Sequence, residues 1–155
     1  MADADDDVVT VERVIPAPAS EIFALLADPA RHRDIDGSGT VRDAKAGSQK
    51  LQLGSEFGMS MKLGIPYSMV SKVIEFEPDR RIAWQTRSPM AFMGKFLGGR
   101  IWRYELEPVD GGTRVRESWD IRQEAVKALV RPAKGKTKDA MDKTLARIEK
   151  VVTEK

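Results

Sequence analysis

The stretch Val8-Val-Thr-Val-Glu-Arg-Val-Ile-Pro-Ala-Pro-Ala-Ser-Glu-Ile-Phe-Ala-Leu-Leu26 changes from the pattern of a strand to that of a helix. Val8 to Ile15 is rich in β-branched residues, which fit a pleated sheet, so it predicts a strand. Pro16 and Pro18 end the strand because proline cannot donate to the ladder. Glu21 to Leu26 then repeats apolar residues at helical spacing, which predicts a short helix.

The residues after this helix indicate a stop and a restart. Ser20, or else Ala19, is the expected N-terminal boundary of the first helix. Asp28 can cap a second short helix that spans about Pro29 to Arg33, because proline is well tolerated at a first helical position. The string Asp36-Gly-Ser-Gly39 predicts a loop.

A long β region follows. Segments of β-branched, aromatic and alternating apolar residues, separated by turn signals, predict six more strands in antiparallel succession. Their expected ranges are Thr40 to Lys45, Glu56 to Leu63, Tyr67 to Phe76, Arg81 to Arg87, Gly99 to Glu107, and Thr113 to Arg122. The string Val109-Asp-Gly-Gly112 predicts the hairpin turn between the last two of them.

The C-terminal part predicts one long amphipathic helix. A short helical stretch is expected from about Gln123 to Val130, and a loop over Arg131 to Gly135. Thr137 to Val152 then places Met141 and Leu145, with Ile148 and Val152, on one apolar face. Only this helix is long enough to lie across the sheet, so the order of elements predicts an α+β fold.

Length and composition limit the function classes. The chain has 155 residues, of which 41% are hydrophobic and 32% are charged, which predicts one globular domain over residues 8–155 after an acidic disordered tail at residues 1–7. No apolar run approaches the ~18 residues of a membrane span, so no stable membrane insertion is expected. The acidic N-terminus is unlike a signal peptide, and a cytoplasmic location is expected.

Several kinds of chemistry are disfavoured. The chain has no cysteine and one histidine, His32, so thiolate catalysis is excluded and neither a metal nor another cofactor is expected. The formal net charge of +2 does not favour nucleic acid as a partner. The basic residues between Arg131 and Lys138 are interpreted as a solvated loop.

Several strings resemble a known superfamily. They are Val11-Glu-Arg-Val-Ile-Pro-Ala-Pro-Ala-Ser-Glu-Ile-Phe23, Ala27-Asp-Pro-Ala-Arg-His32, Asp36-Gly-Ser-Gly-Thr-Val41, Val73-Ile-Glu-Phe-Glu-Pro78, and Gly111-Gly-Thr-Arg-Val115 with Trp119. With the order of elements, the chain resembles the START-like (SRPBCC) superfamily over residues 8–152, in its polyketide cyclase/dehydrase-like branch. The second and third strings resemble a bacterial, actinobacterial subgroup.

The resemblance implies a helix-grip fold, in which a curved antiparallel sheet of about seven strands wraps around the C-terminal helix and leaves a cavity between them. Family members bind lipids, sterols, polyketides or plant hormones, and a minority are cyclases or dehydratases. None of the matching strings is a catalytic motif, so the resemblance transfers the fold and not a reaction.

The first candidate site is the apolar inner face of the sheet. Methionine adapts to irregular shapes, and tryptophan and tyrosine add flat area with a polar handle. The alternative is ordinary core packing. The candidate ligand-binding residues are Met59, Met61, Met69, Trp84, Trp102, Tyr104, Glu117 and Trp119 on the strands, Met90 and Phe92 in a loop, and Met141 and Leu145 on the last helix.

Glu117 is the first single residue considered for a chemical role. It shares the alternation of Val115 and Trp119, so its carboxyl is expected to point inward and to be paired, hydrated or protonated. Arg100 is the expected partner in a structural ion pair. The functional alternative is a polar anchor or a general acid–base.

The second candidate is His32 with Asp36, because an imidazole oriented by a carboxylate can serve as a base near neutral pH. The alternative is a histidine that bonds to backbone at a helix end. The third candidate is the apolar loop Ser88 to Gly98, interpreted either as a lid over the cavity or as a dimer contact.

The leading hypothesis is a non-catalytic carrier of an apolar small molecule, lipid or polyketide-like. The rival is an aromatase/cyclase or dehydratase that uses His32 or Glu117. A third possibility is a dimeric interaction module without a ligand, and the chain is expected to be a monomer or a homodimer.

Overall fold

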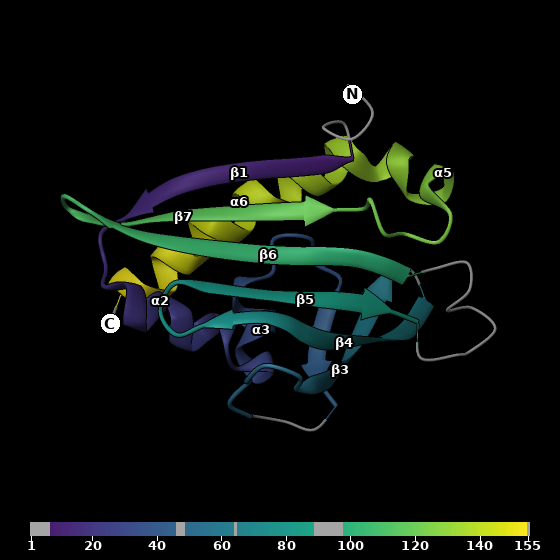
Figure 1. Cartoon of the computed structure of the whole chain (residues 1–155), viewed down its shortest axis with the longest axis horizontal. Helices are drawn as coiled ribbons and strands as arrows, with labels where there is room; N and C mark the ends of the chain where they lie inside the picture. Colours follow the sequence, from purple (N-terminus) through teal and green to yellow (C-terminus); the bar gives the residue numbers. More distant parts are fainter. Residues whose placement is uncertain (1–6, 46–48, 64, 89–97, 155) are drawn as a thin grey trace.

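The computed structural model describes residues 7–45, 49–63, 65–88 and 98–154. Within these residues the chain forms a curved sheet, a long C-terminal helix and short helices (Figure 1). The strands are β1 (Val8–Ile15), β2 (Val41–Ala44), β3 (Glu56–Leu63), β4 (Ile65–Glu77), β5 (Arg81–Arg87), β6 (Gly98–Val109) and β7 (Gly112–Asp120). The helices are α2 (Ala19–Leu26), η1 (Pro29–Arg31), α3 (His32–Ile35), α5 (Lys127–Val130), η2 (Arg131–Ala133) and α6 (Lys134–Thr153).

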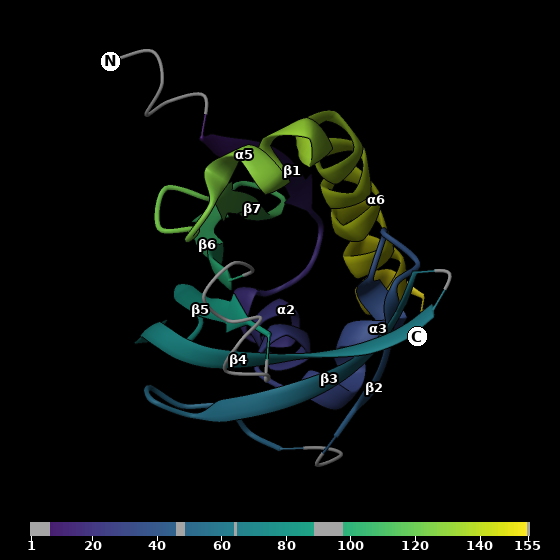
Figure 2. The ribbon, with the colours of Figure 1, turned by 90° about the vertical axis from the view of Figure 1, so that its right-hand side faces the viewer.

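The strands form one 7-stranded antiparallel sheet in the order β1-β7-β6-β5-β4-β3-β2. Figure 2 shows that the sheet curves round from β1 to β2, with α2 and α3 inside the curve and α6 along its open side. The helix α6 packs mainly against β1 and α3. The predicted α+β helix-grip fold is confirmed.

The inner, concave face of the sheet carries the core. Ile15, Ile82 and Val115 are fully buried there, and Leu145 and Ile148 of α6 are buried from the opposite side. Apolar side chains at alternate positions of each strand and at helical spacing along α6 therefore meet between the two layers.

A bulge in β4 adjusts this pattern. The register with β5 shifts between Val73 and Glu75, so that Val73 lies opposite Trp84 and Phe76 lies opposite Ile82. Alternation alone would give Val73 and Phe76 opposite faces, and the extra residue brings both to the inner face. Phe76 there packs edge-on against Phe23 of α2, with ring centroids 5.5 Å apart.

One predicted helix boundary differs from the structure and another agrees with it. The helix α2 begins at Ala19 after Pro18, and no side chain caps it, so Ser20 is not the N-cap. Asp28, in contrast, does cap η1, because its carboxylate accepts a hydrogen bond of 3.1 Å from the Ala30 N–H.

The predicted loop over Arg131 to Gly135 is wrong. Arg131–Ala133 forms η2, and α6 starts at Lys134 and runs for 20 residues. Pro132 and Gly135 lie in the first turns of η2 and α6. The backbone N–H groups of a first turn need no partner within the helix, so a proline is tolerated there.

Asp7, predicted as part of a disordered tail, is buried and ordered. Its carboxylate accepts two hydrogen bonds of 3.0 Å from the Arg131 guanidinium, and its carbonyl accepts a bond of 2.9 Å from the Ile121 N–H. Arg131 is therefore also not a free member of a solvated basic loop. The rest of the predicted tail lies outside the described residues.

The loop after α3 touches α6 through Gly37. Its N–H donates to the Thr144 hydroxyl at 2.9 Å, and a Cβ added to Gly37 would lie 2.2 Å from the Ala140 carbonyl oxygen. Only a residue without a side chain lets the two backbones approach this closely. Arg147 of α6 strengthens the contact by donating to the Asp36 carbonyl at 2.8 Å.

We expect Gly37→Ala to destabilise the protein by about 1–3 kcal/mol, because α6 has to move away to make room for the methyl group. Urea unfolding followed by circular dichroism measures this change. Gly135→Ala is the matched control, since no heavy atom lies within 4 Å of the added Cβ. It should leave the stability equal or up to about 1 kcal/mol higher. Equal midpoints for the two variants would contradict the close approach.

Candidate functional site

The three tryptophans of the chain lie in register on three adjacent strands of the inner face. Trp84 of β5 lies opposite Trp102 of β6, and Trp102 lies opposite Trp119 of β7. The rings of Trp102 and Trp119 have centroids 6.3 Å apart at 40°. Cross-strand neighbours on one face are within reach of large side chains, and Trp84 contacts Tyr104 in the next row with ring centroids 5.7 Å apart.

The next row contains the buried acid. Tyr104 of β6 lies opposite Glu117 of β7, and its hydroxyl donates to Glu117 Oε2 at 2.8 Å. Glu117 is only 2% exposed, as expected for an inward-facing position. The predicted partner is wrong, however: Arg100 instead pairs with Glu124, Nε to Oε2 at 3.1 Å.

Burial controls the protonation of this pair. Removal from water raises the pKa of Glu117 to about 8, and the negative charges of Asp36 and Asp142 act in the same direction against the hydrogen bond from Tyr104. Burial and the neighbouring Glu117 also raise the pKa of the Tyr104 hydroxyl well above its usual value. Both groups are therefore mostly uncharged at neutral pH, which suits their apolar surroundings.

Two polar atoms on this face lack a partner. Among the described residues, Glu117 Oε1 and Trp119 Nε1 are the fully buried side-chain polar atoms with no hydrogen bond. Buried polar groups are nearly always bonded, so an unsatisfied one calls for a physical reason. Because the two residues are two positions apart on β7, both side chains lie on the inner face.

His32 packs into the same aromatic layer. Its ring stacks on Trp84 with centroids 5.0 Å apart at 20°, and it meets the edge of Phe57 at 5.6 Å. Its Nε2 donates to the Leu26 carbonyl at 2.9 Å, because a carbonyl oxygen only accepts. Burial lowers the pKa of His32, so the ring is neutral and structural near pH 7.

The predicted orientation of His32 by Asp36 is wrong. The Asp36 carboxylate accepts from the Ser38 backbone and hydroxyl at 3.0 and 2.6 Å, and from the Val41 N–H at 3.0 Å. It therefore fixes the turn that leads into β2. The alternative reading of His32, a ring bonded to backbone near a helix end, fits the structure.

The remaining candidate ligand-binding residues form two groups that differ in solvent exposure. Buried members are Met59, Trp84, Tyr104, Trp119, Met141 and Leu145. Met61, Met69 and Trp102 face the same side but remain partly exposed. Met90 and Phe92, with most of the predicted lid, lie outside the described residues.

Hollows on the outer surface do not coincide with these residues. One of about 390 Å³ lies between the β4–β5 turn and the β6–β7 hairpin, beside Arg80, Glu105 and Arg114. Another of about 620 Å³ lies beside Arg31 and Arg147. None of the predicted ligand-binding residues lines either one.

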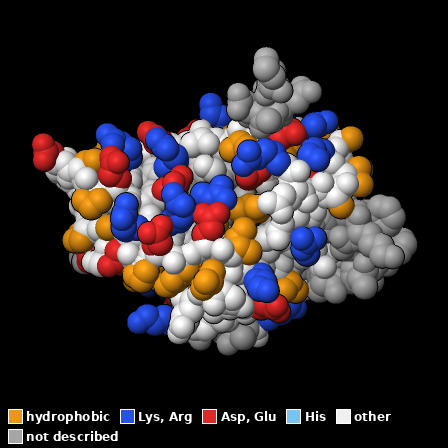
Figure 3. Space-filling view, viewed as in Figure 1, with side chains coloured by type: hydrophobic (Ala, Val, Ile, Leu, Met, Phe, Trp, Pro, Cys, Tyr) orange, Lys and Arg blue, Asp and Glu red, His pale blue; other side chains and the backbone are white. Residues whose placement is uncertain are grey.

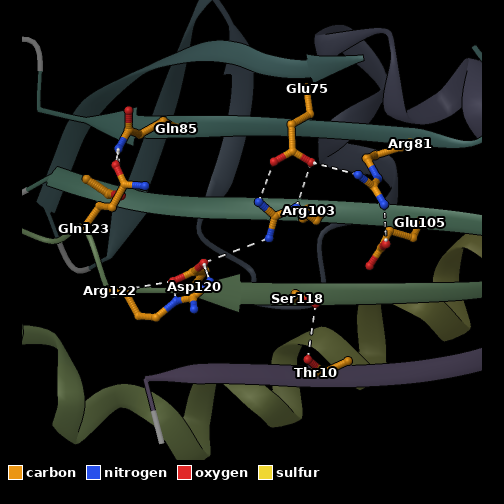
Figure 4. Close-up of polar contacts among 11 residues, drawn as sticks. Thr10, Glu75, Arg81, Gln85, Arg103, Glu105, Ser118, Asp120, Arg122 and Gln123 are labelled. Carbon is orange, nitrogen blue, oxygen red and sulfur yellow. Dashed lines mark hydrogen bonds and ion pairs between the residues drawn. The ribbon is translucent and has the colours of Figure 1, made fainter. Parts of the chain in front are cut away.

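The outer face of the sheet carries paired charges. Figure 3 shows acidic and basic side chains intermixed over it. Arg103 binds Glu75 through two hydrogen bonds of 2.9 and 2.6 Å and lies 4.0 Å from Asp120, as Figure 4 shows. Arg81 joins the same network through Glu75 at 3.8 Å and also donates to Glu105 at 3.0 Å. These charges pair with one another, whereas the two buried side-chain atoms without a hydrogen bond among the described residues both lie on the inner face.

No group of three histidine, aspartate or glutamate side chains among the described residues could hold a metal ion. No helix in that part of the chain is long and apolar enough to cross a membrane.

The fold and the inner face define a helix-grip protein, and solved structures share this architecture. A protein of Chromobacterium violaceum, CV1439, superposes with a TM-score of 0.73 at 17% identity over 94% of this chain and 96% of that one. NE0264 of Nitrosomonas europaea gives a TM-score of 0.74 at 14% identity over 96% of each chain. At such low identity these likenesses concern the fold alone.

The family described as polyketide cyclase / dehydrase and lipid transport matches residues 7–153, and the chain belongs to this family. Its curated relatives include the uncharacterized protein Rv0088 of Mycobacterium tuberculosis, 39% identical over 122 residues. The match covers 77% of this chain and 50% of that protein, so the chain spans about half the length of the curated relatives it matches.

Sequence reasoning missed two polar contacts. Tyr104 was identified as a lining residue but not as the partner of Glu117, because the register of β6 against β7 is not visible in alternation. Glu124 was not singled out, although it is 3% exposed, binds Arg100, and accepts from the Gly98 N–H at 2.8 Å. A lone glutamate beyond a strand gives no periodic signal.

We expect Glu117→Gln to remove part of the pH dependence of unfolding. The pKa of Glu117 is about 8 in the folded protein against 4.5 for a free carboxyl. The folded state therefore holds this proton more tightly, and its contribution to stability is full below pH 4.5 and is lost as the pH rises through 8. The slope over this window is about 1.4 kcal/mol per pH unit at most.

Urea unfolding of both proteins from pH 4.5 to 9 measures the difference. The variant should gain stability relative to the wild type as the pH rises. Glu107→Gln, at an exposed position on the outer face, is the control and should follow the wild type. Parallel curves for Glu117→Gln and the wild type would contradict a raised pKa.

Proposed function

We propose that this protein binds an apolar small molecule, lipid or polyketide-like, against the concave face of the sheet, as a non-catalytic binding or carrier protein. The observation that carries this proposal is the pair of unpartnered buried atoms, Glu117 Oε1 and Trp119 Nε1, in an otherwise apolar and aromatic face. A ligand that brings one polar atom into this face would satisfy them.

Two further observations support it. Met61, Met69 and Trp102 remain partly exposed on the inner face, where an apolar ligand would cover them. The family description includes lipid transport as well as cyclase and dehydrase activity. The partly exposed methionines also suit a ligand of irregular shape, because their side chains adapt readily.

A second candidate is an enzyme of the cyclase or dehydratase type. The observation that favours it is the Glu117–Tyr104 pair, because a carboxyl that stays protonated near neutral pH can act as a general acid. The structure offers less for His32, whose Nε2 is already engaged with Leu26.

Native mass spectrometry of the purified protein, followed by extraction of any bound molecule, tests the binding proposal. We expect a co-purifying lipid or polyketide-like species, or else stoichiometric uptake of the uncharged fluorescent probe N-phenyl-1-naphthylamine. A folded protein that carries no small molecule and takes up no probe would overturn the proposal.

A matched pair of variants locates the site. Met61 and Lys62 are neighbours on β3 and point to opposite faces of the sheet. Met61→Glu places a charge on the inner face and should weaken probe binding at least tenfold, because burying a charge beside an apolar ligand is costly. Lys62→Glu makes the same side chain on the outer face and should bind the probe like the wild type. Equal affinities would place the probe elsewhere.

The enzyme reading has its own test. If the co-purified molecule is turned over, Glu117→Gln should lower the rate at least a hundredfold, since general acid–base groups contribute about 10²–10⁴-fold. His32→Phe, which keeps a ring against Trp84, should retain most of the rate in protein that remains folded. Unchanged turnover in Glu117→Gln would exclude Glu117 as the acid.

A further inference from the structure

The two unpartnered atoms form a pair of donors. Glu117 Oε2 already accepts the Tyr104 hydroxyl proton, so the proton of the neutral carboxyl resides on Oε1. Trp119 Nε1 carries a hydrogen and can only donate. Both lie on the inner face of β7, and their Cα atoms are about 7 Å apart along the strand. Two donors on one face favour an acceptor.

The surrounding charges favour an uncharged acceptor. Glu117 is influenced by the acidic groups of Asp36, in the loop after α3, and Asp142 of α6, and its hydrogen-bond partner Tyr104 is neutral. On β1, the nearest cation along the inner face, Arg13, lies opposite Val115 and is already paired with Glu149 at 2.9 Å. On β6, Arg100 shares the alternation of Trp102 and is already paired with Glu124 at 3.1 Å. Among the described residues of β1, β6 and β7, a ligand carboxylate on the inner face would therefore meet acids and cations that are already paired.

We propose that the ligand presents an uncharged carbonyl oxygen to Glu117 Oε1 and Trp119 Nε1, an inference that rests on the proposed binding function. A carbonyl oxygen has two lone pairs and can accept from both donors at once. The ligand class is then a ketone, ester or lactone on an apolar skeleton. Free fatty acids and plain hydrocarbons are disfavoured.

Entry to the donor pair requires a side chain to move, because both atoms are fully buried. Trp102 is the candidate. It lies opposite Trp119, its ring is 6.3 Å from the Trp119 ring, and it retains partial exposure where Trp119 is 2% exposed. We place the route of the ligand beside Trp102.

The test compares three naphthalenes of similar size by displacement of N-phenyl-1-naphthylamine at pH 6. They are 2-acetylnaphthalene, 2-ethylnaphthalene, which lacks the oxygen, and 2-naphthoate, which carries a charge. We expect the ketone to bind at least tenfold more tightly than either analogue, because a site built to bond an oxygen rejects a ligand that leaves its polar groups unpaired.

Substitutions at Glu117 and Trp119 test whether these two donors cause the preference for the ketone over the hydrocarbon. Glu117→Leu and Trp119→Phe should each reduce the ratio of ketone to hydrocarbon affinity at least fivefold. Glu117→Gln, which retains an N–H donor, should restore part of that ratio and shows that a loss in Glu117→Leu is not a folding defect. Glu107→Gln on the outer face is the control and should keep the wild-type ratio.

The outcomes separate the two proposals. If the purified protein carries no small molecule and neither the probe nor any of the three compounds binds, the binding function itself is overturned. If ketone and hydrocarbon bind equally, the binding function stands, but trapped water supplies the two hydrogen bonds and the carbonyl inference falls. Tightest binding by 2-naphthoate would also overturn it.

Discussion

The first strand pairs with the last along its whole length, from Val8 opposite Asp120 to Ile15 opposite Thr113. This pairing places β1 at the edge of the sheet, beside β7 and next to α6, and so determines where the long helix can lie. The Asp7–Arg131 ion pair and the Arg13–Glu149 ion pair join the same edge to the C-terminal segments. The concave face is enclosed because these contacts hold the helix against one side of the curve.

Enclosure explains the chemistry of Glu117. The carboxyl is held between β1 and β6 by strand pairing, with Val11 opposite it on one side and Tyr104 on the other. Burying a charged carboxylate in such a place costs free energy, and this cost is smallest when Glu117 keeps its proton. The fold thus keeps the Glu117 carboxyl mostly uncharged at neutral pH, at some cost in stability at alkaline pH.

Much of this arrangement was predictable from local patterns. Alternation along Thr113 to Arg122 correctly placed Glu117 and Trp119 on the inner face, and the spacing of Met141 and Leu145 correctly gave the buried face of α6. The register of β6 against β7 does not follow from alternation; it follows from the predicted hairpin turn Val109–Gly112, because a tight turn fixes which residues lie opposite each other. Counted from that turn, Tyr104 lies opposite Glu117, whereas alternation alone pointed to Arg100 as the partner. Arg100 instead bonds Glu124, which lies beyond the end of β7.

The row of tryptophans has a practical consequence. Indole rings held 6.3 Å apart at a fixed angle, as Trp102 and Trp119 are, couple their electronic transitions and give signed bands in circular dichroism. The third indole, Trp84, lies in register on the next strand and extends the row. No tryptophan occurs elsewhere in the chain, so its indole absorption comes entirely from the concave face. The protein therefore carries an intrinsic optical probe of its own interior, without any added label.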